Sequence, residues 1–171
     1  MLKTAGSILI LLASFLYGWR VREELQEHVK QLIGMKEMFQ MLWGEISYAR
    51  TPLKEAFLQI AHQKKEPFSG FLEKAAEEMD ENEESMGSFW GKLVEQEGER
   101  FLFTEEEREL LKRAGENFGY LDGQMQLKNL ELYIEQTEVL IQKAQEELKD
   151  RQKIAGTLSL MCGLFLVILL I

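Results

Sequence analysis

The segment from Ile154 to Ile171 contains 18 residues and no charged side chain. As an α-helix rising about 1.5 Å per residue, it spans about 27 Å, close to the roughly 30 Å hydrocarbon core of a bilayer. A helix buried in a soluble core normally carries a polar stripe, and this one carries none. We therefore predict a transmembrane helix over 154–171, with the chain ending at the far face of the membrane.

A second apolar run opens the chain and ends at Trp19. Tyr17 and Trp19 resemble the aromatic belt of a membrane helix, and Arg20 and Arg22 follow them. A cleaved signal peptide is the alternative, but only one lysine precedes the run and no A-x-A-like cleavage site follows it. We predict a transmembrane anchor over residues 2–19.

The basic residues that flank the two apolar runs predict the orientation in the membrane. Seven of them lie on the central side: Arg20, Arg22, Lys30, Lys143, Lys149, Arg151 and Lys153. Lys3 alone lies on the outer side. The positive-inside rule therefore predicts a cytoplasmic domain over 20–153, both termini extracytoplasmic, and membrane lipid as a partner.

Two apolar stripes with steps of three and four residues flank this domain. They consist of Leu25, Val29, Leu32, Met35, Phe39, Leu42 and Ile46, and of Leu127, Leu130, Ile134, Thr137, Ile141, Ala144 and Leu148. Each is typical of one face of a long helix, and the second helix should start near Asp122. We predict that the two helices continue into the membrane segments and pair antiparallel as a stalk of about 30 to 40 Å.

Shorter helices are expected between the stripes. Thr51 is a suitable N-cap with Pro52 at the first helical position, and Pro67 marks a second break. Residues 104–107 (TEEE) form a capping-box pattern, and Gly119 is a plausible C-cap. No stretch alternates like a β-strand. The predicted fold is all-α: a six-helix cytoplasmic bundle with a stalk pair, four shorter helices as a cap, and two flanking transmembrane helices.

The region from Glu77 to Glu109 is strongly acidic. It holds thirteen acidic and three basic side chains, so its net charge of −10 accounts for the −9 of the whole chain. This charge argues against nucleic acid as a partner. One hypothesis is a docking surface for a basic partner, with Glu81, Glu83, Glu84, Glu105, Glu106 and Glu107 as candidates. The alternative is a solvated loop and helix face.

No motif for catalysis or cofactor binding appears. The chain lacks a phosphate-binding loop, an HExxH zinc motif, an EF-hand loop and a GxSxG nucleophile elbow. His28 and His62 have no cysteine or carboxylate at metal-ligand spacing. Cys162, the only cysteine, lies in the predicted membrane helix. We predict a protein that is not an enzyme, with no catalytic residue, cofactor or metal.

Two short blocks resemble a known family, the stage III sporulation protein AB family. The first block comprises Glu45, Ile46, Tyr48, Thr51, Pro52, Leu53 and Ala56. The second comprises Gly115, Glu116, Phe118, Gly119, Asp122 and Gln126. Phe118 stands where that family more usually has leucine. The resemblance covers essentially the full length, because the apolar segments at both ends also match.

This resemblance implies a role. The family belongs to a channel complex across the two membranes between mother cell and forespore, and its cytoplasmic domain is similar to type II secretion platform proteins. It implies a mother-cell inner-membrane platform that links a secretion-type ATPase, stage III sporulation protein AA, to the other stage III A channel proteins. A homo-oligomer is compatible with this role. The alternatives are a generic scaffold or platform fragment of a type II secretion or type IV pilus-like system, and a membrane enzyme or sensor.

Overall fold

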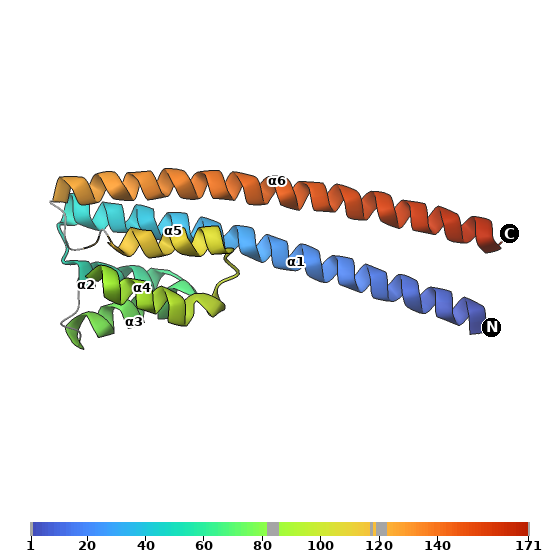
Figure 1. The fold of residues 1–171 in the computed structure, drawn as a ribbon, viewed down its shortest axis with the longest axis horizontal. Helices are drawn as coiled ribbons and strands as arrows, with labels where there is room; N and C mark the ends of the chain where they lie inside the picture. Colours follow the sequence, from blue (N-terminus) through green and yellow to red (C-terminus); the bar gives the residue numbers. More distant parts are fainter. Residues whose placement is uncertain (1, 82–85, 117, 119–122, 171) are drawn as a thin grey trace. The chain divides into compact units, whose positions relative to one another are not determined.

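The computed structural model describes residues 2–81, 86–116, 118 and 123–170, and every regular element within them is helical (Figure 1). The α-helices are α1 (Leu2–Gly44), α2 (Leu53–Gln63), α3 (Phe68–Glu81), α4 (Met86–Glu97), α5 (Glu105–Glu116) and α6 (Gly123–Leu170). A π-helix (Glu45–Ala49) follows α1, and a 3₁₀-helix (Gly98–Arg100) follows α4. The all-α prediction and its six helices are therefore confirmed for the described part of the chain.

The chain divides into two compact units, and the two longest helices run through both. One unit comprises Met1–Val29 and Gln142–Ile171, and the other comprises Lys30–Ile141. The 43 residues of α1 and the 48 residues of α6 are continuous. This confirms that each stripe helix extends without a break into the apolar segment at its end of the chain.

The first unit exposes large apolar side chains. Leu16, Trp19, Ile154, Met161 and Phe165 are each at least 60% exposed. Within the described residues, no helix has a stretch long and apolar enough to qualify as a membrane span. The side chain of Cys162 lies outside the described residues.

In the second unit, α1 and α6 pack antiparallel. Lys36 Nζ lies 2.8 Å from Glu138 Oε2, and the rings of Phe39 and Tyr133 lie 5.9 Å apart. Because the partner numbers fall as the α1 numbers rise, the two helices run in opposite directions. Seven stripe residues of the two helices are buried in this unit: Leu32, Met35, Phe39, Leu42, Leu130, Thr137 and Ile141. The predicted antiparallel pairing is confirmed within this unit.

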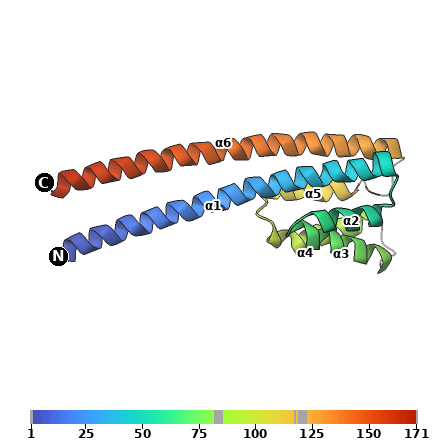
Figure 2. The ribbon, with the colours of Figure 1, turned by 180° about the vertical axis from the view of Figure 1, so that it is seen from behind.

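The shorter helices lie beside α1 and do not cap its end (Figure 2). Gln31 Oε1 accepts a hydrogen bond from the Leu102 N–H at 2.7 Å. Phe68 packs so closely on Gly34 that a Cβ there would lie 2.7 Å from its ring. Lys64 also pairs with Glu37. The predicted cap is thus corrected: α1 buries its second face along these helices, which hydrophobic burial favours over a separate distal layer.

Aromatic side chains fill the space between the short helices. Trp90 is fully buried, with its ring 5.1 Å from Phe71, 5.2 Å from Phe118 and 5.5 Å from Phe57. Its Nε1 donates to the Leu111 carbonyl at 2.8 Å, so the buried indole is satisfied. One tryptophan therefore joins α2, α3, α4 and α5 in a single core.

Candidate functional site

The first motif forms the bend between α1 and α2. The π-helix Glu45–Ala49 is followed by Arg50, whose backbone is left-handed with φ 51°. The N–H groups of Arg50 and Thr51 both point to the Glu45 carbonyl, at 3.2 Å for Thr51. Glycine or asparagine normally occupies such a position because a Cβ is disfavoured there.

The structure corrects the role predicted for Thr51. Pro52, one residue later, precedes α2 and its carbonyl accepts the first helical hydrogen bond, from the Ala56 N–H at 2.9 Å. The Thr51 hydroxyl instead donates to the Glu45 carboxylate at 2.7 Å. The Gln59 side-chain amide also faces this carboxylate, and its NH₂ group, assigned to the facing position because it is the only end that can donate, lies 3.2 Å from both oxygens. As an N-cap, the hydroxyl oxygen would accept a hydrogen bond from a neutral backbone N–H. Its bond to a charged carboxylate is stronger, which explains the difference.

We expect Thr51→Ala and Glu45→Gln each to lower the free energy of unfolding by about 1.5–3 kcal/mol, the range for a hydrogen bond to a charged group. Because the two side chains share that bond, the double variant should lose less than the two single losses combined. Urea denaturation of all four proteins measures the coupling. Purely additive losses would show that Thr51 stabilises the bend in some other way.

Tyr48 and Trp43 form the outer part of this bend. The Tyr48 side chain is 82% exposed, although its ring contacts Trp43 edge-on with centroids 5.7 Å apart. The Trp43 Nε1 is buried and has no hydrogen-bond acceptor among the described residues. The motif therefore combines a firmly bonded inner side with an aromatic side chain that the fold leaves in solvent.

The second motif supports the aromatic core. Gly115, near the end of α5, faces Trp90, and a Cβ at this position would lie 1.9 Å from the indole. Phe118 is buried on the same ring. Gln126 is half-buried on α6. Gly119 and Asp122 lie outside the described residues, so the predicted C-cap is untested.

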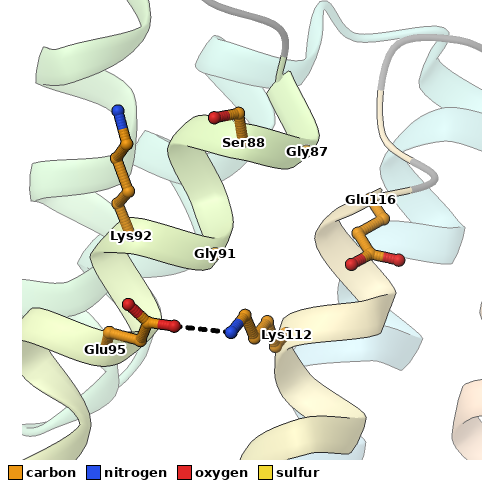
Figure 3. A pocket seen from close by; sticks show the side chains of 7 residues that line it. All are labelled: Gly87, Ser88, Gly91, Lys92, Glu95, Lys112 and Glu116. Atoms are coloured by element: carbon orange, nitrogen blue, oxygen red, sulfur yellow. Dashed lines mark hydrogen bonds and ion pairs between the residues drawn. The ribbon is translucent and has the colours of Figure 1, made fainter.

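An open groove of about 420 Å³ lies between α4 and α5 (Figure 3). It is lined by Gly87, Ser88, Gly91, Lys92, Glu95, Lys112 and Glu116. The Glu95 and Lys112 side chains meet across it at 2.5 Å, while Lys92 points away from this pair in the view shown. The two helices approach closely here, because a Cβ on Gly87 would lie 2.9 Å from the Glu116 Cα.

The charges in this groove are unsuited to proton transfer. The hydrogen bond from Lys112 lowers the pKa of Glu95, and the same bond raises the pKa of Lys112. Both groups therefore stay charged near neutral pH, whereas a general acid or base needs a pKa close to the working pH. The groove holds a structural ion pair between two helices.

The acidic candidates differ in their availability to a partner. Glu105 and Glu106 are exposed in the first turn of α5. Glu107 is only 4% exposed, and its carboxylate accepts from the Thr104 N–H at 2.7 Å. This confirms the predicted capping box and makes Glu107 unsuitable for docking. The Glu81 side chain, Glu83 and Glu84 lie outside the described residues.

Part of the acidic stretch is neutralised internally. The Glu97 carboxylate pairs with Lys74 and, at 2.9 Å, with Arg100, which also lies 3.0 Å from Glu66. The hydrogen bonds from Lys74 and Arg100 hold the pKa of Glu97 below its ordinary value. These contacts tie α3 to the end of α4 and reduce the charge that a partner would meet.

The stability that Glu97 contributes should depend on pH. Because its folded pKa is lowered, the contribution is fully present above the ordinary carboxyl pKa of about 4.5 and is lost as pH falls through the folded value. Glu97→Gln should lower the unfolding free energy at pH 7 by about 1.5–3 kcal/mol, the range for a hydrogen bond between charged groups. Its difference from wild type should shrink below pH 4.5. Denaturation at pH 7 and pH 3.5 tests this, and a pH-independent difference would contradict it.

No metal-binding geometry was found among the described residues, where no three histidine, cysteine or acidic side chains come together. His62 is exposed on α2, and His28 is half-buried on α1. Sequence reasoning missed the left-handed Arg50, the Trp90–Gly115 contact and the Gln31–Leu102 hydrogen bond. Of these three features, only the Trp90–Gly115 contact includes a residue that the sequence motifs had singled out, namely Gly115.

The fold and the motifs define a class: an all-α protein in which two long helices carry a compact bundle. The family model for stage III sporulation protein AB matches residues 3–171, and the chain therefore belongs to this family of sporulation proteins, which is not a known enzyme family. It is 28% identical over 170 residues to stage III sporulation protein AB of Bacillus subtilis (strain 168), covering 99% of each chain. A solved structure of a stage III sporulation protein AB is similar with a TM-score of 0.67 and 27% identity, covering 72% of this chain and 97% of that chain.

Proposed function

We propose that this protein is a non-enzymatic membrane platform that couples a cytoplasmic secretion-type ATPase to the sporulation channel complex between mother cell and forespore. The observation that carries the proposal is the continuity of α1 and α6, which join apolar end segments to a compact helical bundle. A continuous helix transmits a displacement along its axis, whereas a flexible linker dissipates it. Membership of the sporulation family supports this role over a generic secretion or pilus scaffold.

The proposal places the protein in the mother-cell inner membrane, with 2–19 and 154–171 as transmembrane helices. The exposed side chains of Trp19, Met161 and Phe165 support this placement, because large apolar side chains in water are unfavourable and lipid would cover them. The basic residues beside the apolar runs support a cytoplasmic bundle with both termini in the intermembrane space.

Reporter fusions at both termini test this topology. A periplasmic-type reporter, which is active only outside the cytoplasm, should be active at either end. A cytoplasmic reporter should be inactive there but active when inserted after Glu81, the last residue of α3. Cytoplasmic activity at Ile171 in a membrane-bound protein would contradict the topology.

The proposed partners are the ATPase stage III sporulation protein AA and the other stage III A channel proteins. Glu105 and Glu106 offer an exposed negative surface that would attract a basic face of a partner. The double substitution Glu105→Gln with Glu106→Gln should weaken ATPase binding most at low salt. Glu131→Gln with Glu135→Gln, on the exposed face of α6, is the matched control. Unchanged affinity and salt dependence would show that these acids serve solubility alone.

A further inference from the structure

We propose that Tyr48 and Arg50, together with the neighbouring Pro52, form a docking surface for a carboxylate-bearing protein partner; we call these three residues the corner patch. The inference rests on the proposed function, since the occupant it names is an acidic, partly apolar surface of the coupled ATPase. It adds a contact at the bend between α1 and α2 to the one proposed for Glu105 and Glu106 on α5.

Stability does not explain the residues of the corner patch. Tyr48 is 82% exposed, so its ring contributes little to the core. Arg50 adopts φ 51°, where glycine or asparagine would be more stable. A residue kept in an unfavourable backbone conformation, beside an exposed aromatic ring, is typical of a surface maintained for binding.

The surrounding structure holds the corner patch in place. The Thr51 hydroxyl bonds the Glu45 carboxylate at 2.7 Å, and the Gln59 amide lies 3.2 Å from the same group. Trp43 supports the Tyr48 ring edge-on at 5.7 Å. The π-helix from Glu45 to Ala49 is itself a rare element that occurs frequently at functional sites. A pre-organised surface loses less conformational entropy on binding.

The chemistry of the patch selects the occupant. Tyrosine and arginine are the residues that most often dominate protein interfaces, and the guanidinium fork matches a carboxylate. The adjacent Glu45 is half-buried with its carboxylate bonded to the Thr51 hydroxyl, whereas Arg50 is exposed, so a partner at this corner would meet the guanidinium first. One arginine provides too little attraction for a lipid surface or a nucleic acid, since each basic residue near an anionic membrane contributes only about 1 kcal/mol. A protein surface with an acidic side chain beside an apolar hollow satisfies both residues.

The test measures binding of the purified ATPase to the full-length chain in lipid nanodiscs, using wild type, Tyr48→Ala, Arg50→Gly and Arg50→Lys. We expect Tyr48→Ala and Arg50→Gly each to weaken binding at least about tenfold. Arg50→Gly should also flatten the salt dependence, while Tyr48→Ala should leave it unchanged. Arg50→Lys keeps the charge, so its affinity should lie between those of wild type and Arg50→Gly. Leu132→Ala, which removes an apolar side chain 47% exposed on α6, is the control and should bind as wild type does.

Thermal unfolding separates binding from folding. Arg50→Gly should have a Tm equal to or above that of wild type, because glycine relieves the left-handed backbone. Normal binding by both variants would overturn the corner patch while leaving the proposed function standing. No binding by the wild type would overturn the proposed function, and the assignment of this occupant with it. A Tm loss in Arg50→Gly that parallels its binding loss would also overturn the inference, since Arg50 would then serve the fold.

Discussion

Replacing Gly115 by alanine is expected to destabilise the helical bundle by about 3 kcal/mol or more, the upper range for overpacking of a rigid core. The added Cβ would lie 1.9 Å from the Trp90 indole, which is fully buried and hydrogen-bonded to Leu111 at 2.8 Å. The indole is rigid and lies among three other aromatic rings, so it cannot move aside. Urea denaturation followed by circular dichroism measures the loss.

Two further variants make this prediction specific. Gly44→Ala places the same methyl group in a helix where nothing lies within 4 Å, and it should leave stability unchanged or raise it. Trp90→Leu vacates the space that the new Cβ needs, so Gly115→Ala should cost less in that background than in wild type. Equal costs in both backgrounds would show that the clash with Trp90 is not the cause.

Phe39→Ala is expected to lower the unfolding free energy by about 3–5 kcal/mol, as large-to-small changes in a close-packed core do. Phe39 is fully buried and its ring lies 5.9 Å from that of Tyr133, so the change opens a cavity where α1 meets α6. The Lys36–Glu138 pair is too exposed to compensate. Chemical denaturation again gives the magnitude.

Leu132→Ala is the matched control for this second prediction. It removes an apolar side chain from the same helix pair, but one that is 47% exposed, and it should change stability by less than about 1 kcal/mol. A small loss for Phe39→Ala, comparable with that of Leu132→Ala, would contradict the antiparallel contact between α1 and α6.

Hydrophobic periodicity was sufficient to predict the helices. The stripe that contains Leu32, Met35 and Phe39 is buried as expected, and the capping box at Thr104 begins α5. These features are local, because helical spacing and a side chain reaching three residues along the chain need no knowledge of the tertiary fold. For the same reason, the predicted N-cap of the second helix, Thr51, lies only one residue from the observed N-cap, Pro52.

The candidate site was less predictable because its features depend on contacts distant in sequence. Gly115 is required by Trp90, 25 positions earlier, and no spacing rule links the two. Thr51 is drawn from its expected capping role by Glu45, a competing acceptor that only the bend brings near. The left-handed Arg50 and the π-helix have no sequence signature comparable with a glycine at a helix end. The resemblance marked several of these positions, but the structure supplied their physical reasons.

The proposed function has two parts, that the chain anchors in a membrane and that it brings the ATPase to that membrane. Anchoring and recruitment can be separated by flotation of vesicles that contain phosphatidylglycerol and phosphatidylethanolamine. Empty vesicles and vesicles that hold the full-length chain would each be mixed with purified ATPase and centrifuged through a density gradient. We expect the chain to float with its vesicles through an alkaline carbonate wash, and the ATPase to float only when the chain is present. A chain removed by the wash, or an ATPase that stays at the bottom of the gradient beside floating chain, would contradict the proposed function.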